Sequence, residues 1–285
     1  MNVLKTTMLL AALTAIFMGV GYLIGGEGGA VIALVAAAVL NLVSFWNADR
    51  IVLRMHRAVE VDARSAPEYH AIVRRLSERA GLPMPKLYLI DDPQPNAFAT
   101  GRNPEKGVVA VTQGILDLLE QRELRGVLAH ELAHIRNRDI LVATIAAAIA
   151  SAVTYVAQMI SFSAFLGGSD EEEEGSGTSG LLVALVAPIA ATLIQLGISR
   201  SREYLADESG AAICGDPESL ARALEKLSRG AELVPPTAAQ PATASLYIVN
   251  PFSGGGVARL FSTHPPMEDR VERLRALARR GTIAA

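Results

Sequence analysis

The sequence predicts a mainly α-helical membrane protein with four transmembrane helices and an α+β domain that contains a small antiparallel sheet. The first observation is composition: hydrophobic residues make up 51% of the chain, charged residues 19%, and the mean hydropathy is +0.31. A typical soluble domain is less apolar than this. The second observation is that four apolar runs occur as two pairs, each flanked by basic residues at its outer ends. The third is that the remaining segments show the periodicities of amphipathic helices and short strands.

The N-terminal segment 1–48 is expected to form a transmembrane hairpin. Thr6–Ile24 and Ala30–Trp46 contain no charged residue and are separated only by the glycine-rich Gly25–Gly29. A turn this short favours a hairpin over a cleaved signal peptide. The turn has no Lys or Arg, whereas Lys5 and the arginines between positions 50 and 57 flank the hairpin. The positive-inside rule therefore places both ends of the hairpin in the cytoplasm.

Residues 49–139 are expected to form the first part of the soluble domain. Ser65 and Glu68 have the S-x-x-E spacing of a capping box, which predicts a helix from Ser65 that stops at Gly81. Three short strands are predicted next, the last two joined as a hairpin: Lys86–Ile90, Asn96–Thr100 and Gly107–Thr112. The middle strand has the sequence Asn96, Ala97, Phe98, Ala99, Thr100. It could be an exposed edge strand that binds extended peptides through main-chain hydrogen bonds, or a plain hairpin strand packed on the following helix.

The stretch Glu123–Asp139 is predicted to be an amphipathic helix because its apolar residues recur at helical spacing. His130 and His134 stand about one turn apart and project from one face, with Glu131 between them, so the stretch contains H-E-x-x-H. Two neutral imidazoles are a pair of Zn²⁺ ligands, and the carboxylate can reach a water at the metal. The alternative is a helix with two chance histidines. The chain has only five His, so a chance match at this spacing is rare.

Segment 140–199 is expected to form a second transmembrane hairpin. Two apolar runs, 140–166 and 181–198, enclose an acidic insert at 167–180, and basic residues flank the outer ends of the pair. The same charge rule places the acidic loop away from the cytoplasm. An acidic run is usually a solvated loop, and we assign it no binding role. The alternative is that these alanine-rich runs are buried helices of a soluble domain.

The third zinc ligand should come from the last segment, 200–285, which is expected to complete the catalytic part. A catalytic zinc site needs three protein ligands and an open position. Glu203 is the best candidate because it follows the fourth apolar run, and two crossings return the chain to the face that carries His134. Its alternative is a surface helix glutamate. The segment also contains Cys214, which we interpret as a small buried apolar residue rather than a ligand.

The same residues suggest peptide hydrolysis without a covalent intermediate. Glu131 would act as the general base and pass the proton to the leaving amine. The developing oxyanion needs a further hydrogen-bond donor, which could be His264. Alternatively, His264 is only a histidine at a helix start. A last amphipathic helix is predicted after Pro265 and Pro266, with its leucines and valine inward and its arginines outward.

Composition and motifs also restrict the function classes. The formal net charge of -3 and the lack of a dominant basic patch exclude a nucleic-acid partner. A non-catalytic zinc-binding membrane scaffold or sensor is the main alternative to an enzyme, but a structural site has no need of Glu131 and usually fills its fourth position with protein. A zinc transporter would place ionisable ligands within the spanning runs, and these runs contain none.

Taken together, the motifs resemble the HtpX-type membrane zinc metalloproteases, which are related to the CAAX prenyl endopeptidases. The resemblance rests on H-E-L-A-H, E-x-x-A-D, S-T-H-P-P and N-A-F-A-T-G, and it covers nearly the whole chain. It implies an α+β zincin-like (gluzincin) catalytic domain. It also implies that His130, His134 and Glu203 bind one Zn²⁺ ion and that Glu131 is the catalytic base.

The resemblance implies further roles. Asp207 would orient a zinc ligand or His264 from behind, His264 would stabilise the transition state, and Asn96–Thr100 would be the edge strand that holds substrate. The protein would be a multi-pass protein of the bacterial inner membrane with a cytoplasmic catalytic domain. Its partners would be the lipid bilayer and protein substrates, namely misfolded membrane proteins that it removes under stress.

Overall fold

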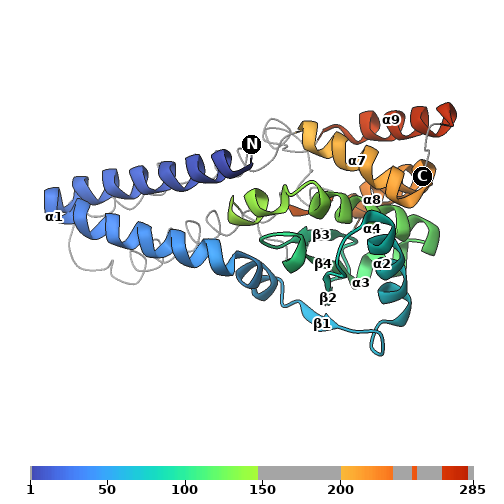
Figure 1. The fold of residues 1–285 in the computed structure, drawn as a ribbon, viewed down its shortest axis with the longest axis horizontal. Helices are drawn as coiled ribbons and strands as arrows, with labels where there is room; N and C mark the ends of the chain where they lie inside the picture. The colour runs from blue at the N-terminus through green and yellow to red at the C-terminus, as the bar shows by residue number, and fades with distance from the viewer. Residues whose placement is uncertain (1, 147–199, 234–245, 249–264, 282–285) are drawn as a thin grey trace.

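The computed structural model describes residues 2–146, 200–233, 246–248 and 265–281. A long helical hairpin projects from a body built of a four-stranded sheet and several helices (Figure 1). The body combines segments from both sides of the 147–199 stretch, so residues far apart in the sequence lie side by side in it.

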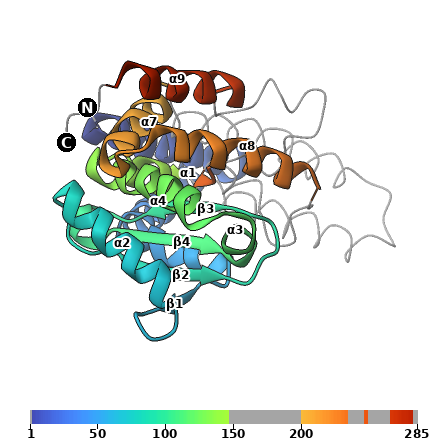
Figure 2. The ribbon, with the colours of Figure 1, turned by 90° about the vertical axis from the view of Figure 1, so that its right-hand side faces the viewer.

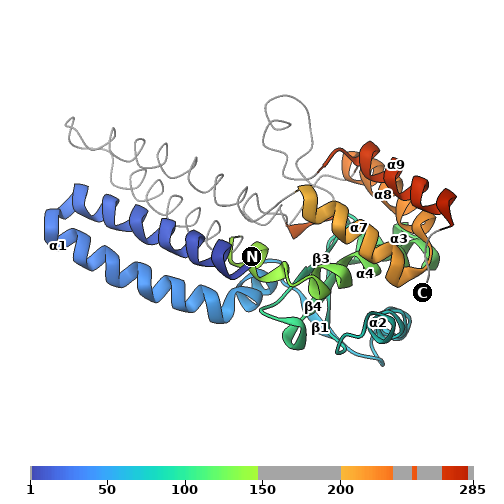
Figure 3. The same cartoon turned by 45° about the horizontal axis from the view of Figure 1, so that its top comes forward.

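The hairpin is the helix α1, Asn2–Met55, which is broken at Gly25 and Gly26. Gly26 has a φ of 59°, a conformation that glycine adopts without strain, and the chain reverses there. The two arms lie side by side and return both ends to the body (Figures 1 and 3). They touch closely, because a Cβ on Gly21 would lie 2.5 Å from the carbonyl oxygen of Gly29. Asn41 also joins the arms by donating to the carbonyl of Leu10 at 3.3 Å.

Within the described residues, one segment is long and apolar enough to cross a membrane, namely Gly25–Val43. The sequence predicted four such helices, so that number is not confirmed. The first predicted run forms the other arm of the hairpin. The run at 181–198 and most of the run at 140–166 lie outside the described residues.

The sheet has the strand order β1-β2-β4-β3 and is mixed, which corrects the predicted antiparallel sheet. Its strands are β1 (Val59–Val61), β2 (Lys86–Ile90), β3 (Ala97–Thr100) and β4 (Val108–Thr112). The predicted β3–β4 hairpin is confirmed, but β2 pairs with β4 in parallel. All five residues of β4 are buried, so the strand is apolar on both faces and suits the centre of the sheet. The short β1 was not predicted.

Helix α2, Pro67–Ala80, packs against α4 and the sheet core. Its predicted capping box is wrong, because the N-cap is Ala66 and no side chain caps the helix. Ser65 is the residue before this cap, and its hydroxyl instead donates a hydrogen bond to the carboxylate of Asp62 at 2.9 Å. The predicted stop at Gly81 is confirmed: its φ of 65° is the left-handed conformation that ends many helices.

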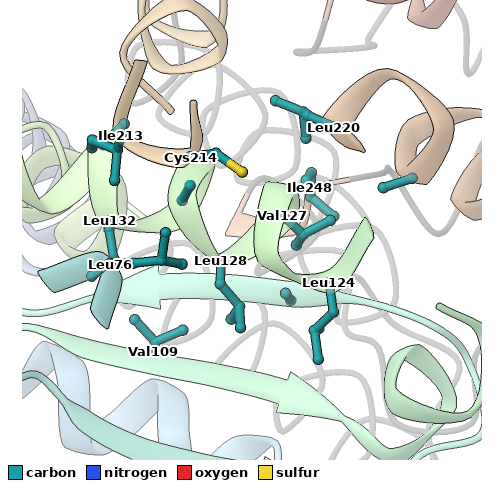
Figure 4. Close-up of a cluster of buried hydrophobic side chains, with 14 of the residues drawn as sticks. Leu76, Val109, Leu124, Val127, Leu128, Leu132, Ile213, Cys214, Leu220 and Ile248 are labelled. Atoms are coloured by element: carbon teal, nitrogen blue, oxygen red, sulfur yellow. The ribbon is translucent and has the colours of Figure 1, made fainter. Parts of the chain in front are cut away.

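The central helix is α4, Gln121–Arg136, which follows the short 3₁₀ turn Pro104–Lys106 and helix α3, Gln113–Leu118. It lies between the sheet and three later helices: α7 (Arg200–Cys214), α8 (Pro217–Leu233) and α9 (Met267–Arg280) (Figure 2). Leu124 and Leu128 point from α4 towards the sheet that carries Val109, while Val127 lies next to Ile248 (Figure 4). Each such side chain contributes roughly 1.5–3 kcal/mol on burial. The core therefore holds α4 on two sides, and Cys214 is buried in it as predicted.

Candidate metal centre

Helix α4 brings the two histidines of H-E-x-x-H together. The Nε2 atoms of His130 and His134 lie 3.1 Å apart, and the two rings are nearly perpendicular. His130 and Glu131 are buried, and the side chain of His134 is 17% exposed. The helix places them one turn apart, as the sequence predicted, and the sheet and α7 enclose them. The imidazoles are thus held in a pocket with limited access to water.

Helix α7 supplies the third donor. The carboxylate oxygens of Glu203 lie 3.6 Å from His130 Nε2 and 3.7 Å from His134 Nε2. The possible ligand atoms of these three residues all lie within 4.8 Å of one another. Zinc binds nitrogen and oxygen at about 2.0–2.2 Å, which separates tetrahedral ligands by about 3.3 Å. The three donors therefore fit a zinc ion if the carboxylate of Glu203 moves slightly closer to the two histidines.

A close approach of α7 to α4 fixes this geometry. Glu203, Asp207 and Gly210 are four and three residues apart, so they share one face of α7. A Cβ on Gly210 would lie 2.8 Å from both Cα and N of His130, so only glycine allows the helices to approach this closely. Gly210 thus brings Glu203 and Asp207 within reach of the histidines.

Each histidine has a carboxylate near its other ring nitrogen. Asp139 accepts from Nδ1 of His134 at 3.2 Å. The Nδ1 of His130 lies 3.0 Å from Oδ1 of Asp207. This distance is short enough for a hydrogen bond, but the angle between the two groups is not suitable for one. Such partners orient a ligating imidazole and leave Nε2 for the metal. Asp207 was predicted in this role, but Asp139 was missed. The sequence pattern placed Asp139 within the predicted helix Glu123–Asp139, but helix α4 ends at Arg136.

The turn after α4 explains the position of Asp139. Arg138 has a φ of 56°, so the chain folds back, and the N–H of Asp139 donates to the carbonyl of His134 at 3.3 Å. A left-handed residue directly after a helix is typical of a C-terminal cap. The sequence does not predict this cap, because the left-handed residue is Arg138 rather than the usual glycine.

The electrostatics of the pocket favour a cation. Burial would lower the pKa of His134, but Asp139 and Glu203 outweigh it and raise the pKa to about 10. Burial would raise the pKa of Asp207, but a neighbouring arginine and His130 hold it below its ordinary value. Burial raises the pKa of Glu131 above its ordinary value. The carboxylates thus surround the imidazoles with negative charge that a divalent metal ion would balance.

Strand β3, predicted as a substrate strand, lies at the edge of the sheet but all four of its residues are buried. It packs on α4, and the main-chain N–H of Ala99 donates to the carboxylate of Glu131. At its outer edge, the N–H of Ile248 donates to the carbonyl of Ala97 at 3.2 Å. The strand thus packs on α4 and its main chain near Ala97 is occupied by Ile248, while the role of Asn96–Thr100 in holding substrate stays a prediction.

Two further residues complete the comparison with the sequence. His264 lies outside the described residues. Arg270 on α9 was grouped with the outward arginines, but it is fully buried and donates to Asp207. Its only sequence signal is its position next to Val271, on the inward side of an amphipathic helix.

A buried His-His-Glu donor set, with a second glutamate between the histidines and a strand packed on the same helix, defines a metal-dependent hydrolase of the H-E-x-x-H class. The model of Peptidase family M48 matches residues 63–278, which include both halves of the site. The chain therefore belongs to peptidase family M48 and is a metalloprotease.

Relatives extend the match over nearly the full length. The chain is 56% identical over 277 residues to a protease HtpX homolog of Syntrophobacter fumaroxidans, covering 96% of this chain and 98% of the relative. It is 54% identical over 283 residues to one of Paraburkholderia phytofirmans, covering 98% of each. The crystal structure of S. mikatae Ste24p matches with a TM-score of 0.51 at 19% identity, covering 96% of this chain and 65% of Ste24p. That last likeness concerns the fold.

Proposed function

We propose that this chain is a zinc-dependent endopeptidase of the bacterial inner membrane, with a cytoplasmic active site, that degrades misfolded membrane proteins. The observation that carries the proposal is the donor set of His130, His134 and Glu203, all within 4.8 Å, beside the buried carboxylate of Glu131. Residues 49–139 and 200–285 together form the catalytic domain, and 140–199 interrupts it.

In this proposal His130 and His134 hold zinc through Nε2, and Glu203 holds it through its carboxylate. When bound, zinc supplies a Lewis acid that activates water and polarises the scissile carbonyl. Glu131 accepts the proton of the attacking water and later gives it to the leaving amine. The N–H of Ala99 keeps the carboxylate of Glu131 in place. Asp207 and Asp139 hold the imidazoles in the tautomer that presents Nε2.

His264 is proposed to donate a hydrogen bond to the developing oxyanion. We expect His264→Ala to lower kcat by on the order of 10²–10³-fold, as loss of such a donor typically does. Zinc content should stay near that of the wild type, since His264 is not a ligand in this scheme. The measurement is steady-state peptide hydrolysis beside metal analysis. An unchanged kcat would reduce His264 to a residue at a helix start.

The substrate is proposed to bind in an extended conformation along Asn96–Thr100. The hydrogen bond from Ile248 to Ala97 supports this, because it is the main-chain contact that an added strand would make. A bound substrate would have to take the place of Ile248 at that carbonyl. Since Phe98 points into a buried cluster, recognition there would rest on the main chain of β3 and select shape more than sequence.

The membrane location is supported by the hairpin. Its span Gly25–Val43 has a mean hydropathy of 1.9 and is 6% buried, so its apolar side chains face outward. Val31, Ile32 and Val35 are all more than half exposed, which suits lipid rather than water. The basic residues that flank the hairpin support a cytoplasmic active site. A scaffold or sensor without hydrolysis is the alternative, and the buried Glu131 argues against it.

Two substitutions test the assignment of roles. Glu131→Gln removes the base and keeps the size, so zinc should remain while casein cleavage collapses. Glu203→Ala removes a ligand, so zinc affinity and cleavage should fall together. Both are measured on detergent-purified protein, with and without a chelator. Glu208→Ala, an exposed glutamate of the same helix, is the matched control and should retain both properties. Normal cleavage by Glu131→Gln would overturn the mechanism, and full zinc affinity of Glu203→Ala would place the third ligand elsewhere.

A further inference from the structure

The guanidinium of Arg270 is buried deep in the domain, beside the metal centre. Its side chain is 0% exposed and is the largest among those fully buried in the described part of the chain. Burying an ionised group costs several kcal/mol unless it is paired and hydrogen-bonded. Other arginines of α9, such as Arg273 and Arg279, remain exposed, so the helix does not bury its positive charges in general. The position of Arg270 therefore calls for a specific partner.

That partner is Asp207. Nε of Arg270 donates to one carboxylate oxygen at 2.9 Å and Nη2 donates to the other at 2.7 Å. This two-pronged geometry fixes the plane and direction of a carboxylate, which a single contact does not. The remaining nitrogen, Nη1, donates to the carbonyl of Ile248 at 3.2 Å, so the guanidinium is itself held in place.

The oxygen of Asp207 that accepts from Nη2 is the one that faces the histidine. Oδ1 lies 2.7 Å from Arg270 Nη2 and 3.0 Å from His130 Nδ1. Arg270 Nη2 also lies 3.8 Å from a carboxylate oxygen of Glu203. Nη2 also lies 3.4 Å from Nε2 of His130. One cation thus contacts the carboxylate beside His130 and directly approaches two proposed ligands, His130 and Glu203. These four residues come from α9 (Arg270), α7 (Asp207 and Glu203) and α4 (His130), so α9 reaches the metal centre through this contact.

We propose that Arg270 is a positioning residue of the metal centre, which holds the carboxylate of Asp207 beside Nδ1 of His130 and so leaves Nε2 of His130 to the metal. The proposal rests on the proposed zinc peptidase function. Arg270 neither binds the metal nor touches the substrate in this scheme. Its positive charge also offsets the repulsion between the carboxylates of Asp207 and Glu203, which would otherwise move apart.

Arg270→Lys tests the geometry because it keeps the charge and loses the two-pronged contact. We expect zinc affinity, measured by competition with a chromophoric chelator, to fall by on the order of 10–100-fold, the usual effect of losing a partner behind a ligand. The visible absorption of the Co²⁺-substituted protein should change as well, because it reports ligand geometry. Arg279→Lys, on the exposed side of the same helix, is the matched control and should leave both unchanged.

A double variant separates positioning from general support of the fold. If Arg270 acts through Asp207, then Asp207→Asn combined with Arg270→Gln should bind zinc no more weakly than Asp207→Asn alone. The double variant removes both buried charges and so leaves neither of them unpaired. It can therefore be measured even if Arg270→Lys fails to fold. Additive losses, or wild-type zinc affinity in Arg270→Lys, would overturn the proposal. Failure of the wild-type protein to bind zinc would instead overturn the proposed function.

Discussion

At the scale of single residues, buried groups that are not ligands set the properties of the site and its surroundings. His56 is one of them, although it lies apart from the metal centre. It follows α1, is 1% exposed, and packs with Phe98 and Tyr247; the hydroxyl of Tyr247 lies 2.9 Å from its Nδ1. It therefore couples the end of the hairpin to the back of strand β3.

His56 predicts a dependence of stability on pH. Burial lowers its pKa from the ordinary 6.5 to about 4, with Asp92 opposing the shift. The folded protein thus holds it neutral, so its contribution is complete above pH 6.5 and is lost as pH falls towards 4. A shift of this size corresponds to about 3 kcal/mol. His56→Gln should therefore lose less free energy of unfolding than the wild type between pH 7.5 and 4.5, measured by denaturant titration. Equal losses would contradict the assignment.

At the scale of elements, the distance between α4 and α7 decides whether the donors meet. Within the described residues, α4 and α7 pack against each other more extensively than any other two elements. Gly210 of α7 lies against the backbone of His130. The ligands of α7 lie on the same face as this glycine. A change in helix separation at Gly210 is therefore transmitted to both Glu203 and Asp207.

Gly210→Ala should test this packing. In an ordinary helix interior, alanine is about 1 kcal/mol more favourable than glycine. Here the added Cβ would meet the backbone of α4 at 2.8 Å, so we expect lower thermal stability and weaker zinc binding. Gly19→Ala, in a helical position with nothing within 4 Å, is the control and should not weaken zinc binding. A Gly210→Ala protein with raised stability and normal zinc affinity would show that the helices can separate without consequence.

At the scale of the whole molecule, the hairpin meets the body at the end opposite its tip, and α4 and α7, which carry the candidate metal centre, lie beyond that end (Figure 1). Arg102, in the turn after β3, lies 4.2 Å over the ring of Trp46 near the end of the second arm. Such a contact contributes roughly 0.5–1 kcal/mol at an exposed site. It links the turn after β3 to the second arm of the hairpin.

The orientation in the membrane can be tested with single cysteines. Cys214 is buried, so the wild-type protein provides an unlabelled background. Glu173→Cys, in the acidic insert, should react with an impermeant maleimide in intact cells. Glu105→Cys, on the exposed turn of the body, should react only after the inner membrane is opened. Labelling of Glu105→Cys in intact cells would place the catalytic domain outside the cytoplasm.

The sequence by itself determined the local chemistry of this protein. Helical periodicity and H-E-x-x-H placed His130, Glu131 and His134 on one buried helix, because a spacing of four residues fixes a shared face whatever packs around it. The apolar hairpin, the β3–β4 pair and the end of α2 at Gly81 followed from similar short-range rules. Glu203 was identified from its chain position and motif, and the structure places its carboxylate beside both histidines.

Tertiary structure decided what depends on distant segments. The parallel pairing of β2 with β4 follows from a connection whose path local patterns do not record. Asp139 reaches His134 only because Arg138 adopts a left-handed turn, and Arg270 is buried only because α9 packs on α7 next to Asp207. Arg270 looks solvent-exposed in the sequence, since the stabilising partner of a buried charge lies far away along the chain.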